Sequence, residues 1–210
     1  MATLRTGEFG NYYGSFFDDS EPLSSANQQV NAKYIYSYLF AEGWSINAIA
    51  GLLGNMQAES SINPGRWQSD NVGSTSNGYG LVQWTPATKY INWCTNNGYS
   101  DPSAMDNNLK RIIYEINNGL QWIATSKYNF SFKEFSKSNK TVSELAKAFL
   151  LNYERPADQS SSVQAYRAKL AEQWYTYLTG QAPTQPGSTS KKKKRKYNFV
   201  VFNRRKRSSL

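Results

Sequence analysis

The sequence predicts a mainly α-helical domain over residues 27–180, flanked by an extended N-terminal arm and by a C-terminal linker and tail. Several segments carry apolar residues at helical spacing, and capping or stop residues mark their ends. No region is rich in strand signals. A hydrophobic content of 39%, including many aromatic residues, is enough to build a sizeable core.

The hydrophobic pattern of the chain becomes helical near Asn27. Residues 1–26 are rich in Gly, Ser and aromatic residues without a helical period, so we expect them to form an extended arm. A first helix is predicted from Asn27 onward, and Gly43 provides its stop signal. Its apolar residues at helical spacing are Val30, Tyr34, Tyr38 and Leu39.

The second predicted helix begins after the N-cap Ser45 and runs to about Ala58. Gly51 and Gly54 inside it each cost roughly 1 kcal/mol relative to Ala, so we expect another helix to pack closely there. A Gly- and Ser-rich excursion over residues 60–80 then predicts a small loop or hairpin region. The apolar residues of this helix are Ile46, Ile49, Leu52, Leu53 and Met56.

Capping signals predict further helices along the rest of the chain. The first of these has proline at its first helical position, and the third begins with a capping box. They run from Thr85-Pro86 to Asn97-Gly98, from Ser103 or Asp106 through Ile116, from Thr141-Val-Ser-Glu144 through Tyr153, and from about Ser162 to Leu178 before Gly180.

The positive charge is concentrated in the C-terminal tail. The chain has 24 Lys and Arg against 15 Asp and Glu, a net charge of +9, but residues 191–210 hold ten basic residues and no acidic one. Residues 1–190 therefore carry 14 minus 15, or −1. We expect no nucleic-acid binding except through this basic tail, which follows a linker at residues 181–190.

The composition excludes several kinds of site. The chain has no histidine and one cysteine, which rules out a Ser-His-Asp triad, a His-ligated zinc site and an internal disulfide. We therefore expect no cofactor and no metal. No segment reaches the roughly 18 apolar residues of a membrane span, and the N-terminus lacks a signal-peptide pattern.

Glu59 is the candidate catalytic acid. It follows Leu52 by seven residues and Met56 by three, which continues the apolar face of the second helix. Burial and the negative end of the helix both disfavour an ionised carboxylate, as a proton donor to a glycosidic oxygen requires. The same periodicity also fits a glutamate at a helix end that turns into water.

Several separated motifs accompany Glu59. Gln57-Ala-Glu59-Ser60 is followed by Asn63-Pro64-Gly65 and then by Gly78-Tyr-Gly-Leu-Val-Gln83-Trp84. This order resembles the lysozyme and lytic transglycosylase superfamily, in which Glu-Ser at a helix end precedes Gly-Leu-x-Gln. More narrowly it resembles the phage tail lysozyme domain family, including the lysozyme domain of phi29-like podovirus tail knob proteins. The resemblance extends from Asn31 to Gly180.

The resemblance implies a lysozyme-like fold that cleaves the β-1,4 bond between N-acetylmuramic acid and N-acetylglucosamine. Glu59 matches the catalytic acid, and Gly80, Leu81 and Gln83 match the segment lining the sugar cleft. Tyr79 is expected to offer a ring face to the sugars. Tyr153 matches an aromatic residue near the catalytic glutamate, although a packed core aromatic is the alternative.

The second carboxylate and the reaction type stay open. Asp70, in the polar excursion, is the candidate for a hydrolase's second carboxylate, with an ordinary loop aspartate as the alternative. A lytic transglycosylase of the superfamily needs only one glutamate, because the 6-hydroxyl of the sugar replaces water. Two other functions also stay open: an inactive structural tail protein with a lysozyme fold, and a virion protein that binds nucleic acid through its basic tail.

The resemblance also implies location and partners. We expect the protein in the virion, at the phage tail, acting on the peptidoglycan of the host cell wall. Other tail proteins are the expected partners, through residues 1–26 and 191–210. The phi29-like relatives also carry a zinc metallopeptidase, and without histidine we expect this chain to cleave glycan but not peptide cross-links.

Overall fold

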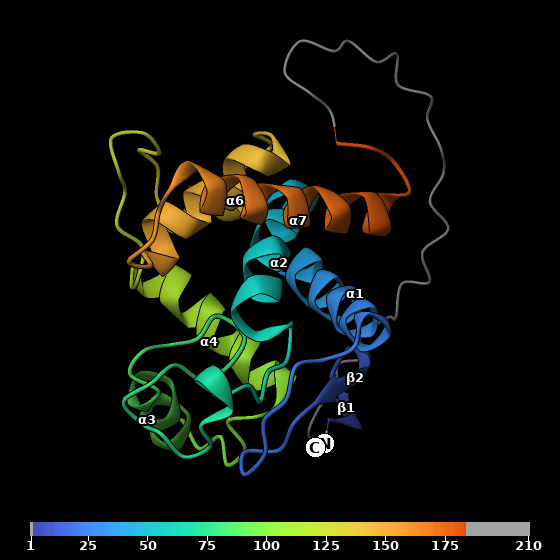
Figure 1. Cartoon of the computed structure of the whole chain (residues 1–210), viewed down its shortest axis with the longest axis vertical. Coiled ribbons are helices and arrows are strands. Elements are labelled where there is room, and N and C mark those ends of the chain that lie inside the picture. The colour runs from blue at the N-terminus through green and yellow to red at the C-terminus, as the bar shows by residue number, and fades with distance from the viewer. Residues whose placement is uncertain (1, 184–210) are drawn as a thin grey trace, which may run out of the picture.

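A computed structural model describes residues 2–183, so the predicted basic tail and most of the predicted linker lie outside the described residues. The mainly α-helical prediction is confirmed (Figure 1). In chain order the elements are β1 (Thr3–Gly7), β2 (Gly10–Gly14), α1 (Ser25–Ala41), α2 (Ile46–Ser60), the 3-10 helix η1 (Gln68–Asp70), α3 (Thr88–Asn96), α4 (Met105–Asn118), α5 (Phe132–Lys137), α6 (Val142–Phe149), the π-helix η2 (Leu150–Glu154) and α7 (Ser161–Thr179).

Helix α2 is the central element of the molecule. It packs against α1, α6 and α7, and Figure 1 shows it running through the middle of the fold. The predicted close packing at its two glycines is confirmed. A Cβ on Gly54 would lie 2.6 Å from the backbone nitrogen of Ala171 in α7, and one on Gly51 would lie 3.1 Å from that of Ala146 in α6. These glycines let two helices lie directly against the backbone of α2.

Side-chain caps fix where the helices begin. Ser45 accepts a hydrogen bond from the backbone of Ala48 at 3.1 Å, and the capping box predicted at Thr141 and Glu144 is present. The helix predicted to start at Pro86 begins at Thr88 instead. The backbone amide of Ala87 donates to the carbonyl of Asn77 at 2.7 Å, which ties this residue to the preceding loop rather than to the helix.

The N-terminal segment folds onto the helices as an antiparallel hairpin, which the sequence analysis did not predict. Asn31 in α1 accepts from the amide of Tyr13 and donates to its carbonyl, both at 2.7 Å. Lys110 in α4 forms an ion pair with Glu8 at 3.0 Å. The hairpin is therefore fastened to two helices, while the predicted division of the chain into an arm and a domain stays a prediction.

The excursion after α2 contains two isolated β-bridges, from Tyr79 to Trp67 and to Trp84, around a cluster of aromatic side chains. Its sequence favours turns, and positive φ angles at Ser69, Asp70 and Gln83 bend the backbone back toward α2. The excursion and α3 lie below α2 in Figure 1. Along the described part of the chain, no helix is long and apolar enough to cross a membrane.

Candidate active site

Glu59 lies in the last turn of α2 and forms an ion pair with Arg167 of α7. Arg167 Nη2 lies 2.5 Å from Glu59 Oε1, and the two side chains are 10% and 19% exposed. Arg167 also donates through Nη1 to the carbonyl of Asn55 at 2.8 Å, which fixes the guanidinium on α2. Glu59 is thus partly buried, as its spacing from the apolar residues predicts.

An open cleft of about 490 Å³ lies beside this ion pair. Polar and charged side chains from four parts of the chain converge there: the end of α2, the excursion, the Gly80–Gln83 turn and the end of η2. This size is in the range of pockets that hold small ligands. Its lining includes Glu59, Arg66, Gln68, Gln83, Glu154 and Arg155.

Ser60 positions the Gly80–Gln83 turn against the end of α2. Its hydroxyl lies 2.9 Å from the carbonyl of Leu81, and the amide of Leu81 donates to Asn108 Oδ1 in α4 at 3.0 Å. Gly80 has φ +86°, and a Cβ there would lie 2.7 Å from Asn108 Oδ1. Gly80 and Leu81 are therefore supporting residues that place Gln83 in the cleft.

Gln83 presents a fixed amide group to the cleft. Its Nε2 donates to the carbonyls of Arg66 at 3.1 Å and Gly80 at 2.9 Å, so the donor side of the amide is bound within the loop. Its Oε1 is buried and has no hydrogen-bond partner in residues 2–183. The acceptor is thus held in place and available to a hydroxyl or amide of a ligand.

Unpartnered polar atoms gather at this cleft. Within the described part of the chain, seven buried side-chain polar atoms have no hydrogen-bond partner, and three of them belong to residues that line the cleft. Buried polar groups are normally hydrogen-bonded, so such a concentration favours a binding surface. The three atoms are Arg66 Nη1, Gln83 Oε1 and Glu154 Oε1.

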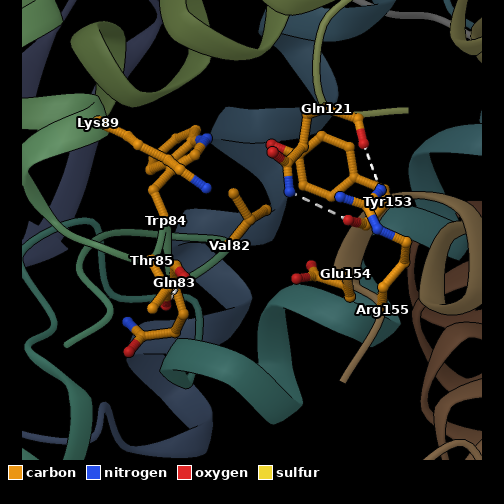
Figure 2. Close-up of a pocket in the computed structure, with 9 residues that line it drawn as sticks. All are labelled: Val82, Gln83, Trp84, Thr85, Lys89, Gln121, Tyr153, Glu154 and Arg155. Carbon is orange, nitrogen blue, oxygen red and sulfur yellow. Dashed lines mark hydrogen bonds between the residues drawn. The ribbon is translucent and has the colours of Figure 1, made fainter. Parts of the chain in front are cut away.

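A smaller pocket of about 190 Å³ continues the cleft toward α3 (Figure 2). It shares Gln83, Thr85, Glu154 and Arg155 with the larger one, so the two form neighbouring parts of one surface. Figure 2 shows the carboxylate of Glu154 directed toward the side of the pocket formed by Val82. Burial raises the pKa of Glu154 well above its ordinary value, and the charge of Glu59 adds to this effect.

Tyr153 and Glu115 form a buried network beneath the smaller pocket. The Tyr153 hydroxyl donates to Glu115 Oε2 at 2.5 Å, while Trp84 Nε1 and Arg111 Nε both lie 2.9 Å from Glu115 Oε1. Burial raises the pKa of Glu115, and these three hydrogen bonds oppose the shift. Tyr153 also stacks on Phe149 with ring centroids 4.4 Å apart, so it supports the pocket wall from the core.

The structure brings only some of the predicted site residues together. Glu59, Gln83 and Tyr153 line the two pockets. Tyr79 is fully buried, packs on Trp67 with ring centroids 4.4 Å apart, and lines neither pocket. The sequence analysis expected Tyr79 to offer its ring face to the sugars, but the ring lies in the aromatic core.

Asp70, the predicted second carboxylate, does not line the cleft. It forms an ion pair with Arg66 at 3.1 Å and accepts a hydrogen bond from the Ser20 hydroxyl at 2.7 Å. The carboxylate beside Glu59 in the cleft is instead Glu154, to which the sequence analysis gave no catalytic role. Arg167 was also missed, because no local pattern in α7 marks an arginine that reaches α2.

Comparisons with known proteins identify the family of the chain. The profile of the phage tail lysozyme family matches residues 30–178. "Morphogenesis protein 1" of Bacillus phage B103 is 51% identical over 169 residues, which cover 80% of this chain. The match covers 45% of that protein, so the chain spans about half the length of this relative. The chain belongs to the phage tail lysozyme family.

Proposed function

We propose that this protein is a phage virion enzyme that cleaves the β-1,4 bond between N-acetylmuramic acid and N-acetylglucosamine in the host cell wall. The observation that carries the proposal is that Glu59 and Gln83 line one cleft of about 490 Å³, in a chain of the phage tail lysozyme family. The cleft is open to solvent, and most of the residues that line it are polar or charged, which suits the binding of a glycan.

In the proposed reaction the carboxyl group of Glu59 gives its proton to the glycosidic oxygen. The bond between the anomeric carbon and that oxygen then breaks, and positive charge develops on the sugar ring. Attack by water forms a reducing N-acetylmuramic acid end, whereas attack by the sugar's own 6-hydroxyl forms a 1,6-anhydro end. In both cases the nucleophile's proton returns to a carboxylate, which restores Glu59 for the next cycle.

The same family membership supports a place at the phage tail. A tail enzyme of this kind opens the wall locally during entry, and its partners are peptidoglycan and neighbouring tail proteins. We propose residues 1–26 as one contact region, because the hairpin and the segment after it expose Leu4, Phe9, Phe16 and Phe17. Residues 191–210, the other region predicted from the sequence, lie outside the described residues.

The products of wall digestion test this proposal. Purified peptidoglycan from a Bacillus cell wall is incubated with the full chain, and the released fragments are identified by mass spectrometry. Reducing N-acetylmuramic acid ends would identify a hydrolase, and 1,6-anhydro ends a lytic transglycosylase. The absence of released glycan from several wall types would contradict the proposal and favour a structural tail protein with the same fold.

A further inference from the structure

Glu59 and Glu154 lie in one cleft with unequal partners. Glu59 is paired with Arg167 at 2.5 Å. Glu154 as a whole is half-buried, but its Oε1 is buried and has no hydrogen-bond partner among residues 2–183. It is therefore the carboxyl group of the cleft whose ionised form is the less well compensated.

The charged groups facing Glu154 come from three other helices and from Arg155, the next residue in the chain. Glu59 of α2 and Glu115 of α4 disfavour its ionised form, whereas Arg167 of α7 and the neighbouring Arg155 favour it. Burial has the largest effect and also disfavours the charge. The net result is a raised pKa, so the site favours a protonated Glu154 beside an ion-paired Glu59.

We propose that Glu59 and Glu154 share one proton, which Glu154 holds in the resting site and supplies to Glu59 for the cleavage step. The proposal rests on the proposed function of Glu59 as acid. Two carboxylates in one partly buried site ionise in separate steps, because the first negative charge opposes the second. Glu154 is thus a positioning residue for the proton, and Arg167 determines which carboxylate is ionised at rest.

The proton count defines the step. At rest the pair carries one proton, on Glu154. Transfer leaves Glu154 ionised and Glu59 protonated, and Glu59 then passes the same proton to the glycosidic oxygen as the carbon–oxygen bond breaks. When a nucleophile attacks the sugar, its proton returns to the pair. No other reactant is needed.

The pH profile of glycan cleavage by the Glu154→Gln variant, compared with that of the unchanged protein, tests the inference. Glutamine keeps the size and neutrality of the protonated side chain but cannot supply a proton or a charge. Residue 154 then no longer holds the shared proton, so we expect the alkaline limb of the pH profile of kcat/KM to move to lower pH by about one unit. The rate on the acidic side should stay close to that of the unchanged protein. Glu42→Gln, which removes an exposed carboxylate at the end of α1 that lines neither pocket, should leave the alkaline limb where it is.

Two outcomes would overturn the inference while leaving Glu59 as the acid. One is an alkaline limb that does not move in Glu154→Gln, and the other is a uniform loss of rate at all pH values. Either would mean that Glu154 supports the structure or contacts the substrate without sharing the proton.

Carboxyl titration by NMR tests the sharing without reference to activity. With glutamate labelled at the side-chain carbon, the Glu154 resonance should titrate at lower pH in Glu59→Gln than in the unchanged protein, by about one unit. An unchanged titration of Glu154 would overturn the inference. If the protein released no glycan from any wall but this shift appeared, the proposed function would fail while the proton-sharing pair would stand.

Discussion

Arg167 Nη2 and Glu59 Oε1 lie 2.5 Å apart, although 108 residues separate them in the sequence. The contact brings the last helix of the described chain into the candidate active site. Arg167 also holds the carbonyl of Asn55 one turn earlier on α2. A single arginine thereby couples the position of the candidate acid to the packing of α7 against α2.

Replacing this arginine should lower the stability of the folded protein. Arg167→Met leaves the partly buried carboxylate of Glu59 without its cation, so we expect the free energy of unfolding to fall by about 3 kcal/mol. Urea denaturation measures the loss. Lys169→Met, an exposed residue on the same helix, is the matched control and should change stability by less than about 0.5 kcal/mol. Equal stability of the two variants would contradict the structural role of the ion pair.

The glycines of α2 should differ in their tolerance of alanine. Gly54→Ala places a methyl group 2.6 Å from the backbone of Ala171, which forces α7 away, so we expect a loss of about 1–3 kcal/mol. Gly51→Ala meets Leu145 and Ala146 at 3.1 Å and gains helix propensity, so its loss should be smaller. Denaturant midpoints of the two variants provide the comparison, and the reverse order would contradict the packing described for α2.

Removing the Tyr153 hydroxyl, which donates to the buried Glu115, should lower the stability of the folded protein. Tyr153→Phe keeps the ring that stacks on Phe149 but removes the hydrogen bond to Glu115, so stability should fall by about 1–3 kcal/mol. Tyr166→Phe, at a residue that is 55% exposed, should change it little. Thermal denaturation of both variants checks this expectation. No loss in Tyr153→Phe would mean that water or another donor replaces the hydroxyl.

Glu154 predicts a pH dependence of stability. Its folded-state pKa is raised by burial, so the folded protein keeps a proton that the unfolded chain releases above about pH 4.3. The free energy of unfolding of the unchanged protein should therefore fall as pH rises from about 4.3 toward the raised pKa of Glu154. This group contributes a fall of up to about 1.4 kcal/mol per pH unit. Glu154→Gln lacks this pH-dependent loss. The free energy of unfolding of the variant, measured in urea, should therefore rise relative to that of the unchanged protein from about pH 4 upward. A constant difference would show that Glu154 ionises equally in both states.

The sequence predicted the parts of this fold that depend on local patterns. The helical period, Ser45, the Thr141 capping box and Gly180 place α1, α2, α6 and α7 close to their observed bounds. The position of Glu59 at the end of α2 follows from the same period. The β1–β2 hairpin was missed because its stability comes from long-range contacts, such as that of Asn31 with Tyr13, rather than from strong strand signals.

The site was less predictable because its parts meet only in three dimensions. Tyr79 and Gln83 share one short segment, but the turn at Gly80 sends the first into the core and the second into the cleft. Arg167 and Glu154 carry no local signal of their role, since Arg167 reaches α2 across a helix interface and Glu154 is the last residue of the irregular η2 segment. Burial of Glu154 depends on elements that are far apart in the sequence.

Glu59→Gln tests the central claim most directly. Glutamine keeps the size of the side chain and an acceptor for Arg167 but cannot donate a proton to the glycosidic oxygen. On the same purified peptidoglycan, we expect the rate of glycan release to fall by at least about 100-fold relative to the unchanged protein. Thermal denaturation of the variant should show that the fold is retained. Release at an undiminished rate by a folded Glu59→Gln protein would contradict the account.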